Sequence, residues 1–84
     1  MLKAGQRFGV TSEIVAIEPF EDGMRAVIIP VGESLCLVKF PCKADDRMAD
    51  VLWEKRPIVV FGRDLQLRAN ELKTTPKARA AGEN

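Results

Sequence analysis

The chain has 84 residues, of which 46% are hydrophobic and 30% are charged. A chain of this length buries only roughly 60–65% of the surface that it exposes when unfolded, so it forms one small core and has no second domain with which to enclose a cleft. Thirteen Lys and Arg against twelve Asp and Glu give a net charge of +1, which is too balanced to attract nucleic acid or a membrane through bulk charge alone.

The residue types that are missing exclude several kinds of chemistry. The chain has no His, and its two cysteines are Cys36 and Cys42. Four N or S ligands for a structural zinc ion cannot be assembled from this set, and neither Ser–His nor Cys–His catalysis is available. No apolar run approaches the ~18 residues that span a bilayer, and no basic-then-apolar leader opens the chain. We therefore expect a soluble cytoplasmic protein that is not an enzyme and holds no metal or cofactor.

The first half of the chain predicts three β-strands joined by tight turns. Residues 8–18 are rich in β-branched side chains and form the first predicted strand. Because both parities of this run carry apolar residues, we expect a bend or bulge within it. Asp22 and Gly23 then give a strong hairpin signal. A second strand is predicted over 24–31 and a third from 35 to 40 or 42, so that the three strands form an antiparallel meander.

The pattern changes to a helical period after the third strand. Apolar residues between 44 and 56 recur at the spacing of one face of a helix: Ala44, Met48, Val51 and Leu52. Asp45 or Asp46 would cap the start of such a helix, and Pro57 would end it. The spacing therefore predicts an amphipathic helix over 45–56.

Two further strands and a tail complete the predicted order. The apolar run 57–61 predicts a buried strand, and the alternation in 65–69 predicts a half-buried one that extends as far as Leu72. Beyond that residue no large apolar side chain remains. We therefore expect a single domain over residues 1–72, followed by a flexible basic tail over 73–84.

The predicted element order resembles that of the OB-fold, a five-stranded Greek-key barrel with a helix between its third and fourth strands. Three features carry the resemblance over about residues 5–72: the hairpin at Asp22-Gly23, the helix over 45–56, and the Ile-Val-Val-Phe-Gly run at 58–62. The fold class expected is thus mostly β with one helix. A small SH3-like barrel is the alternative, although it usually has a single short turn where this chain predicts a long helix.

The resemblance implies binding of single-stranded nucleic acid across the second and third strands and the neighbouring loops. Phosphate contacts would come from Arg25, Lys39, Arg63 and Arg68, and Phe20 would offer a ring on which a base stacks. One stacked base is worth only about 1–3 kcal/mol, so binding would be weak. We expect a non-enzymatic binding module that works within a larger assembly.

A protein partner is the alternative function, because the second and third strands are apolar at both parities. If Arg25 and Lys39 face outward, the alternation of a strand places Val27, Ile29 and Leu37 outward beside them. The opposite parity would fill the barrel: Met24, Ala26, Ile28, Cys36, Val38 and Phe40. An outer apolar face of this kind should be covered by a second copy of the chain, by another protein, or by a terminal segment.

Overall fold

The computed structural model describes residues 2–43 and 45–72, and the tail predicted over 73–84 lies outside the described residues. Within the described part, the chain forms seven strands and one helix in the order β1 (Arg7–Val10), β2 (Ile14–Phe20), β3 (Gly23–Ile29), β4 (Ser34–Lys39), β5 (Met48–Trp53), β6 (Arg56–Phe61), α1 (Gly62–Arg68) and β7 (Ala69–Leu72). The expectation of a mostly β protein with one helix is confirmed.

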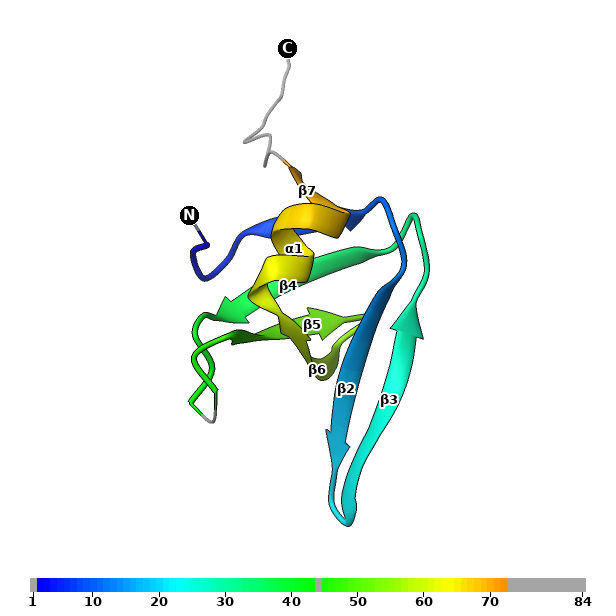
Figure 1. The fold of residues 1–84 in the computed structure, drawn as a ribbon, viewed down its shortest axis with the longest axis vertical. Coiled ribbons are helices and arrows are strands. Elements are labelled where there is room, and N and C mark those ends of the chain that lie inside the picture. The colour runs from blue at the N-terminus through cyan, green and yellow to red at the C-terminus, as the bar shows by residue number, and fades with distance from the viewer. Residues whose placement is uncertain (1, 44, 73–84) are drawn as a thin grey trace.

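All of these strands join one antiparallel sheet in the order β3-β2-β6-β5-β4-β1-β7. The hairpin of β2 and β3 projects from the rest of the sheet and runs across the direction of β4 and β5, so the sheet is strongly twisted (Figure 1). The short helix α1 lies at the opposite end of the molecule from the hairpin turn, next to β1 and β7 (Figure 1). In the described part of the chain, the two edge strands β3 and β7 do not pair with each other, so the sheet is not closed.

The core lies on one face of the twisted sheet and receives side chains from every strand and from α1. Its buried members are Phe8, Val10, Ile14, Ala16, Ile29, Leu35, Leu37, Ala49, Val51, Ile58, Val60, Leu65 and Ala69. No polar or charged residue of the described part is buried. The fold therefore depends on the burial of apolar side chains and the pairing of strands.

The helix predicted over 45–56 is wrong, because Met48–Trp53 is the strand β5. Met48 and Val51 are buried as the helical spacing requires, but Ala49 is buried as well. β5 pairs with β4 on one side and with β6 on the other, and this pairing outweighs a helical preference that rested on a few apolar positions.

The expected helix cap serves a turn in a loop instead. The Asp45 carboxylate accepts a hydrogen bond of 2.9 Å from the backbone N–H of Arg47. This is the local bond that an Asp forms at a helix N-terminus, and here the chain uses it to turn into β5.

The hairpin between β5 and β6 has a turn that its residue types do not reveal. Trp53 pairs with Arg56, and the two residues between them have positive φ angles, 53° at Glu54 and 65° at Lys55. Two positive φ angles are typical of a type I′ turn, which usually contains Asn or Gly. Because neither residue occurs here, nothing in the local sequence marked the turn.

Two strand predictions near the chain ends also need correction. The predicted strand 65–69 is wrong, since Gly62–Arg68 is a helix and only Ala69–Leu72 is extended. Leu65 is buried in the core whereas Leu67 is 67% exposed, so the alternation of the two leucines does not reflect a strand face. The run 8–18 forms two strands, with β1 paired to β4 and β7, and β2 paired to β3 and β6. Where a bend within one strand was expected, the first strand therefore ends at Val10 and a separate strand begins at Ile14.

The remaining strands lie close to their predicted positions. β3, β4 and β6 correspond to the runs predicted over 24–31, from 35 to 40 or 42, and over 57–61. The pairing of Phe20 with Gly23 confirms the hairpin signal at Asp22-Gly23. In the described residues, however, the helix stands between the sixth and seventh strands. The element order on which the OB-fold resemblance rested is therefore not found.

Candidate binding groove

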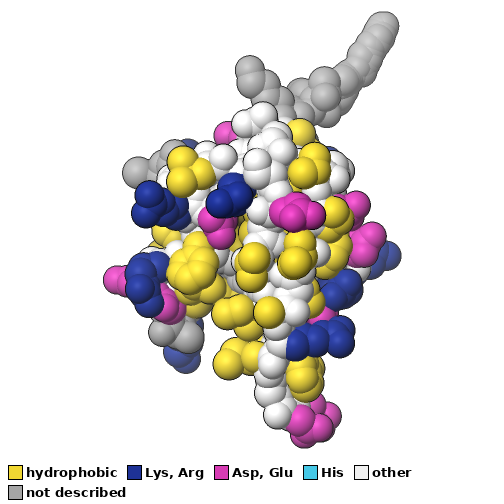
Figure 2. All heavy atoms as spheres, turned by 45° about the vertical axis from the view of Figure 1, so that its right-hand side comes forward, with side chains coloured by type: hydrophobic (Ala, Val, Ile, Leu, Met, Phe, Trp, Pro, Cys, Tyr) yellow, Lys and Arg dark blue, Asp and Glu magenta, His cyan; other side chains and the backbone are white. Residues whose placement is uncertain are grey.

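The outer face of the sheet is apolar across β3, β2, β6 and β5. Strand register places one row of residues across this face: Ala26, Ile17, Val59, Asp50 and Lys39. Because side chains on a strand alternate between faces, the residues two positions away share it. Large apolar side chains are exposed on these positions: Val15, Met24, Ile28, Leu52 and Phe61. In Figure 2, hydrophobic side chains gather in the middle and lower part of the view, with charged side chains above them, at both sides and at the lower tip.

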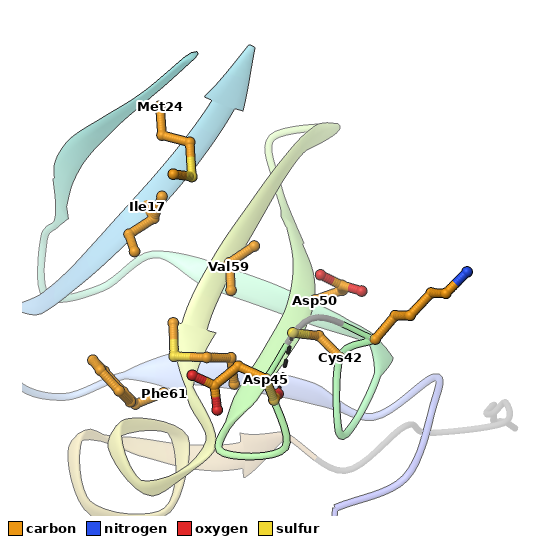
Figure 3. Close-up of a pocket in the computed structure, with 9 residues that line it drawn as sticks. Ile17, Met24, Cys42, Asp45, Asp50, Val59 and Phe61 are labelled. Atoms are coloured by element: carbon orange, nitrogen blue, oxygen red, sulfur yellow. Dashed lines mark hydrogen bonds between the residues drawn. The ribbon is translucent and has the colours of Figure 1, made fainter. Parts of the chain in front are cut away.

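A groove of about 540 Å³ opens on this face between the β2–β3 hairpin and the loop that joins β4 to β5. Figure 3 shows Ile17 and Met24 on the hairpin side, Cys42 and Asp45 on the loop side, and Val59 between them. The complete lining is Ile17, Met24, Cys42, Lys43, Asp45, Met48, Asp50, Val59 and Phe61. A second depression of about 260 Å³ shares Asp50 and Val59 with the first, so that the hollow continues along the sheet.

The groove holds two carboxylates in different situations. The Asp45 carboxylate forms an ion pair of 2.9 Å with the Arg47 guanidinium. Hydrogen bonds from the Arg47 side chain, and then from its backbone N–H, lower the pKa of Asp45 from its ordinary value of 3.8 to about 2. Asp50 is half-buried, and no side chain in the described part of the chain forms a hydrogen bond or an ion pair with it. Asp50 is therefore the carboxylate that a ligand can reach.

The loop wall of the groove is held in place by backbone bonds and by one close approach. The Cys42 thiol donates a hydrogen bond of 3.2 Å to the Asp45 carbonyl. The Gly62 N–H donates to the Arg47 carbonyl at 2.9 Å, which ties the loop to the start of α1. The Phe40 ring lies so close to Gly62 that a Cβ atom built there would be 2.6 Å from the ring. These contacts fix one wall of the groove before any ligand arrives.

The hairpin wall is fixed by an ionic network around Glu18. Arg56 donates two hydrogen bonds to the Glu18 carboxylate, of 2.8 and 2.9 Å, and Arg25 donates two more, of 2.9 and 3.1 Å. The hydrogen bonds from Arg56, and then those from Arg25, lower the pKa of Glu18 from 4.5 to about 2. The Arg56 guanidinium also lies over the Trp53 ring, 4.8 Å from its centroid. The network links the hairpin to β6 and so sets the hairpin's direction.

The residues predicted to bind nucleic acid do not share one surface. Phe20 and Arg25 lie on the β2–β3 hairpin, whereas Arg63 and Arg68 lie on α1 at the opposite end of the molecule (Figure 1). Lys39 ends β4 and pairs in register with Asp50. All five are exposed, but Arg25 is engaged by Glu18, and the Arg68 guanidinium lies 3.5 Å from the Asp64 carboxylate.

The orientation predicted for the partner-binding residues is wrong. Ile29 is 0% exposed, Leu37 is buried, and Val27 is half-buried against the core. Met24 and Ile28 are exposed instead, although the opposite was expected.

The charged residues used to orient these strands gave the wrong parity for the outer face. Arg25 has the same parity as the inward residues Val27 and Ile29. It lies near the hairpin turn, beyond the end of the core, so its side chain is exposed there and pairs with Glu18. A register shift between Leu37 and Lys39 moves that lysine out of the alternation of β4. Val59 and Phe61, which line the groove, were assigned to a buried strand. Residues 58–61 are apolar at both parities, and this was the only signal in the sequence that one side of the strand is exposed.

No protein-family model matches this chain, and no curated protein or solved structure matches it either. Among residues 2–43 and 45–72, no helix has the length and apolarity needed to cross a membrane. The same residues contain no cluster of three or more His, Cys, Asp or Glu side chains placed to hold a metal ion.

Proposed function

We propose that this chain is a non-enzymatic interaction module that binds an extended, apolar segment of a partner protein in the groove between the β2–β3 hairpin and the β4–β5 loop. The observation that carries the proposal is the exposed apolar face on which the groove lies. Soluble monomers rarely leave a continuous apolar surface of this kind uncovered, and such surfaces mark binding sites for proteins.

The partner segment should carry a basic side chain. Asp50 lies where the two hollows meet, beside Val59 on β6 and Lys39 on β4, and no cationic side chain in the described part of the chain forms an ion pair with it. A Lys or Arg of the ligand would pair with this carboxylate while its neighbours bury apolar surface against Val59 and Phe61. A segment of only acidic and polar residues would meet a repulsive charge and gain no apolar burial.

An SH3-like architecture is also part of the proposal. The objection to it was a long helix over 45–56, and no helix lies there, because Met48–Trp53 is the strand β5. The one helix of the described residues is short and stands between the last two strands. Barrels of the SH3 type bind extended peptide segments in surface grooves, which agrees with the groove between hairpin and loop.

The test is a selection of binding peptides from a random display library, followed by titration of synthetic peptides against the chain and two variants. Val59→Glu places a charge on the groove floor and should weaken binding by at least about 100-fold, because it removes apolar burial and adds an unpaired charge. Leu67→Glu changes an exposed residue of α1, away from the groove, and should leave the affinity unchanged. Thermal unfolding of both variants controls for folding.

Two results would refute the proposed groove. One is a library that yields no peptides above background, and the other is a set of selected peptides that bind Val59→Glu as tightly as the native chain. Asp50→Asn tests the charge separately: it should weaken peptides that contain Lys or Arg by about 10-fold and leave their norleucine analogues unchanged.

Single-stranded nucleic acid is the second candidate ligand, favoured by an exposed Phe61 ring that lines the same groove as Lys43. A base would stack on the ring while the lysine meets a phosphate, which predicts weak binding that is lost as salt increases. Fluorescence anisotropy of a labelled oligonucleotide at low and physiological salt tests this candidate. Absence of binding at low salt would eliminate it.

A further inference from the structure

The β3 strand is an unprotected edge of the sheet. It pairs with β2 without a register shift from Gly23 to Ile29, and it has no strand on its other side in the described part of the chain. In an antiparallel pair every second residue directs its N–H and C=O groups away from the neighbour, so β3 presents free backbone groups along its length.

Most of the usual protections of an edge strand are missing from β3. Native proteins guard such edges with charged side chains, especially Lys, or with Pro, bulges or short strands. β3 has seven residues and contains neither Lys nor Pro, and its one charged residue, Arg25, is paired with Glu18 on the neighbouring strand. Met24 and Ile28 are 70% and 59% exposed. The other edge, β7, has only four residues, and Asn70 and Glu71 at its middle are polar. The two edges therefore differ in kind, and only β3 is suited to pair with another strand.

We propose that β3 pairs antiparallel with β3 of a second copy of this chain, so that one sheet continues across a two-fold dimer. Ala26 is the middle residue of Gly23–Ile29, and full-length pairing of two identical strands places it on the dyad. Met24 then lies opposite the partner's Ile28, and Arg25 lies opposite the partner's Val27.

Three features favour a second copy as the partner of this edge. The outer row Met24-Ala26-Ile28 is apolar throughout and matches itself under the dyad, with the small residue at the centre. No two like charges face each other directly, and each Arg25 is already paired with Glu18 of its own chain. The apolar rows of the two copies, including Val15 on β2, form one continuous surface on the outer face.

The first experiment measures the mass of the full chain by sedimentation equilibrium over a roughly 100-fold range of concentration. A reversible dimer is expected. Ile28→Lys introduces the residue that guards natural edge strands and acts in both copies, so it should weaken the dimer by at least about 100-fold, or about 2.8 kcal/mol. Leu67→Lys, at a residue of α1 that is exposed to a similar degree, should leave the dimer unchanged.

The second experiment fixes the register. Ala26→Cys places two thiols across the dyad, where paired Cα atoms about 5.5 Å apart permit a disulfide, so mild oxidation should give a covalent dimer. Val15→Cys, exposed on β2 away from the edge, should stay uncrosslinked, and the native chain controls for Cys36 and Cys42.

The outcomes that would overturn the dimer are distinct from those that would refute the groove. A native chain that is monomeric at every concentration, or a dimer that Ile28→Lys leaves intact, overturns pairing through β3. A dimer that Ile28→Lys dissociates but Ala26→Cys does not crosslink overturns the dyad at Ala26. None of these results depends on Val59, so peptide binding in the groove is tested independently.

Discussion

The close approach of Phe40 to Gly62 predicts that Gly62→Ala destabilises the protein. A Cβ atom at this position would lie 2.6 Å from one ring carbon of Phe40, and 3.1 and 3.3 Å from two others. The ring or the helix start must therefore move. Overpacking of this kind costs about 1–3 kcal/mol. The better helix propensity of Ala offsets about 1 kcal/mol of that cost, so we expect a net loss of about 0–2 kcal/mol, centred near 1 kcal/mol.

A double-mutant cycle separates the steric cause from other effects of the substitution. In a Phe40→Ala background the obstructing ring is gone, and Gly62→Ala should then be neutral or stabilise by up to about 1 kcal/mol. The two substitutions should thus couple by about 2 kcal/mol. Urea unfolding is convenient to follow because Trp53 is the only Trp and the chain has no Tyr. An equal loss of stability in the native and Phe40→Ala backgrounds would refute the reasoning.

Three further predictions concern a turn, an ion pair and the helix. Lys55→Gly should raise the free energy of unfolding by about 1 kcal/mol, because Lys55 holds a φ of 65° that only glycine adopts freely; a lower urea midpoint would contradict this. Because the folded pKa of Glu18 is about 2, below its ordinary value of 4.5, its stabilising contribution is present above pH 4.5 and lost as pH falls toward 2. Thermal melts from pH 7 to 2 should therefore show a shallower loss of stability for Glu18→Gln than for the native chain, and parallel curves would argue against this network. Leu65→Ala should cost about 2–5 kcal/mol and Leu67→Ala almost nothing, whereas equal losses in chemical denaturation would mean that both leucines enter the core.

The groove depends on contacts that bring distant segments together. Its hairpin side is held by Glu18 on β2 and Arg56 on β6, which are 38 residues apart in the chain. Its loop side is held by the bond from Gly62 to the Arg47 carbonyl and by the Phe40 ring. A ligand therefore meets two walls whose positions are set in advance, which lowers the entropic cost of binding.

The sequence alone was sufficient for the coarse fold class, mostly β with one helix, and for several strands, but not for the position of the helix. β-branched residues and the turn signal at Asp22-Gly23 located the first hairpin, because both depend on the conformational preferences of single residues. The apolar runs that became β3, β4 and β6 were found for the same reason. An outer apolar surface was also expected, because strands with apolar residues at both parities cannot bury both in so small a core.

Tertiary structure alone decided which residues form that surface. Strand alternation divides residues into two sets but does not say which set faces inward. Two exposed charges inverted the assignment: Arg25, which pairs with Glu18, and Lys39, which follows a register shift. The segment around Met48 became a strand because β4 and β6 pair with it from both sides, which is information that its own spacing does not contain. Local preferences are fractions of a kcal/mol per residue, so pairing and burial across the whole sheet determine the outcome wherever local signals are ambiguous.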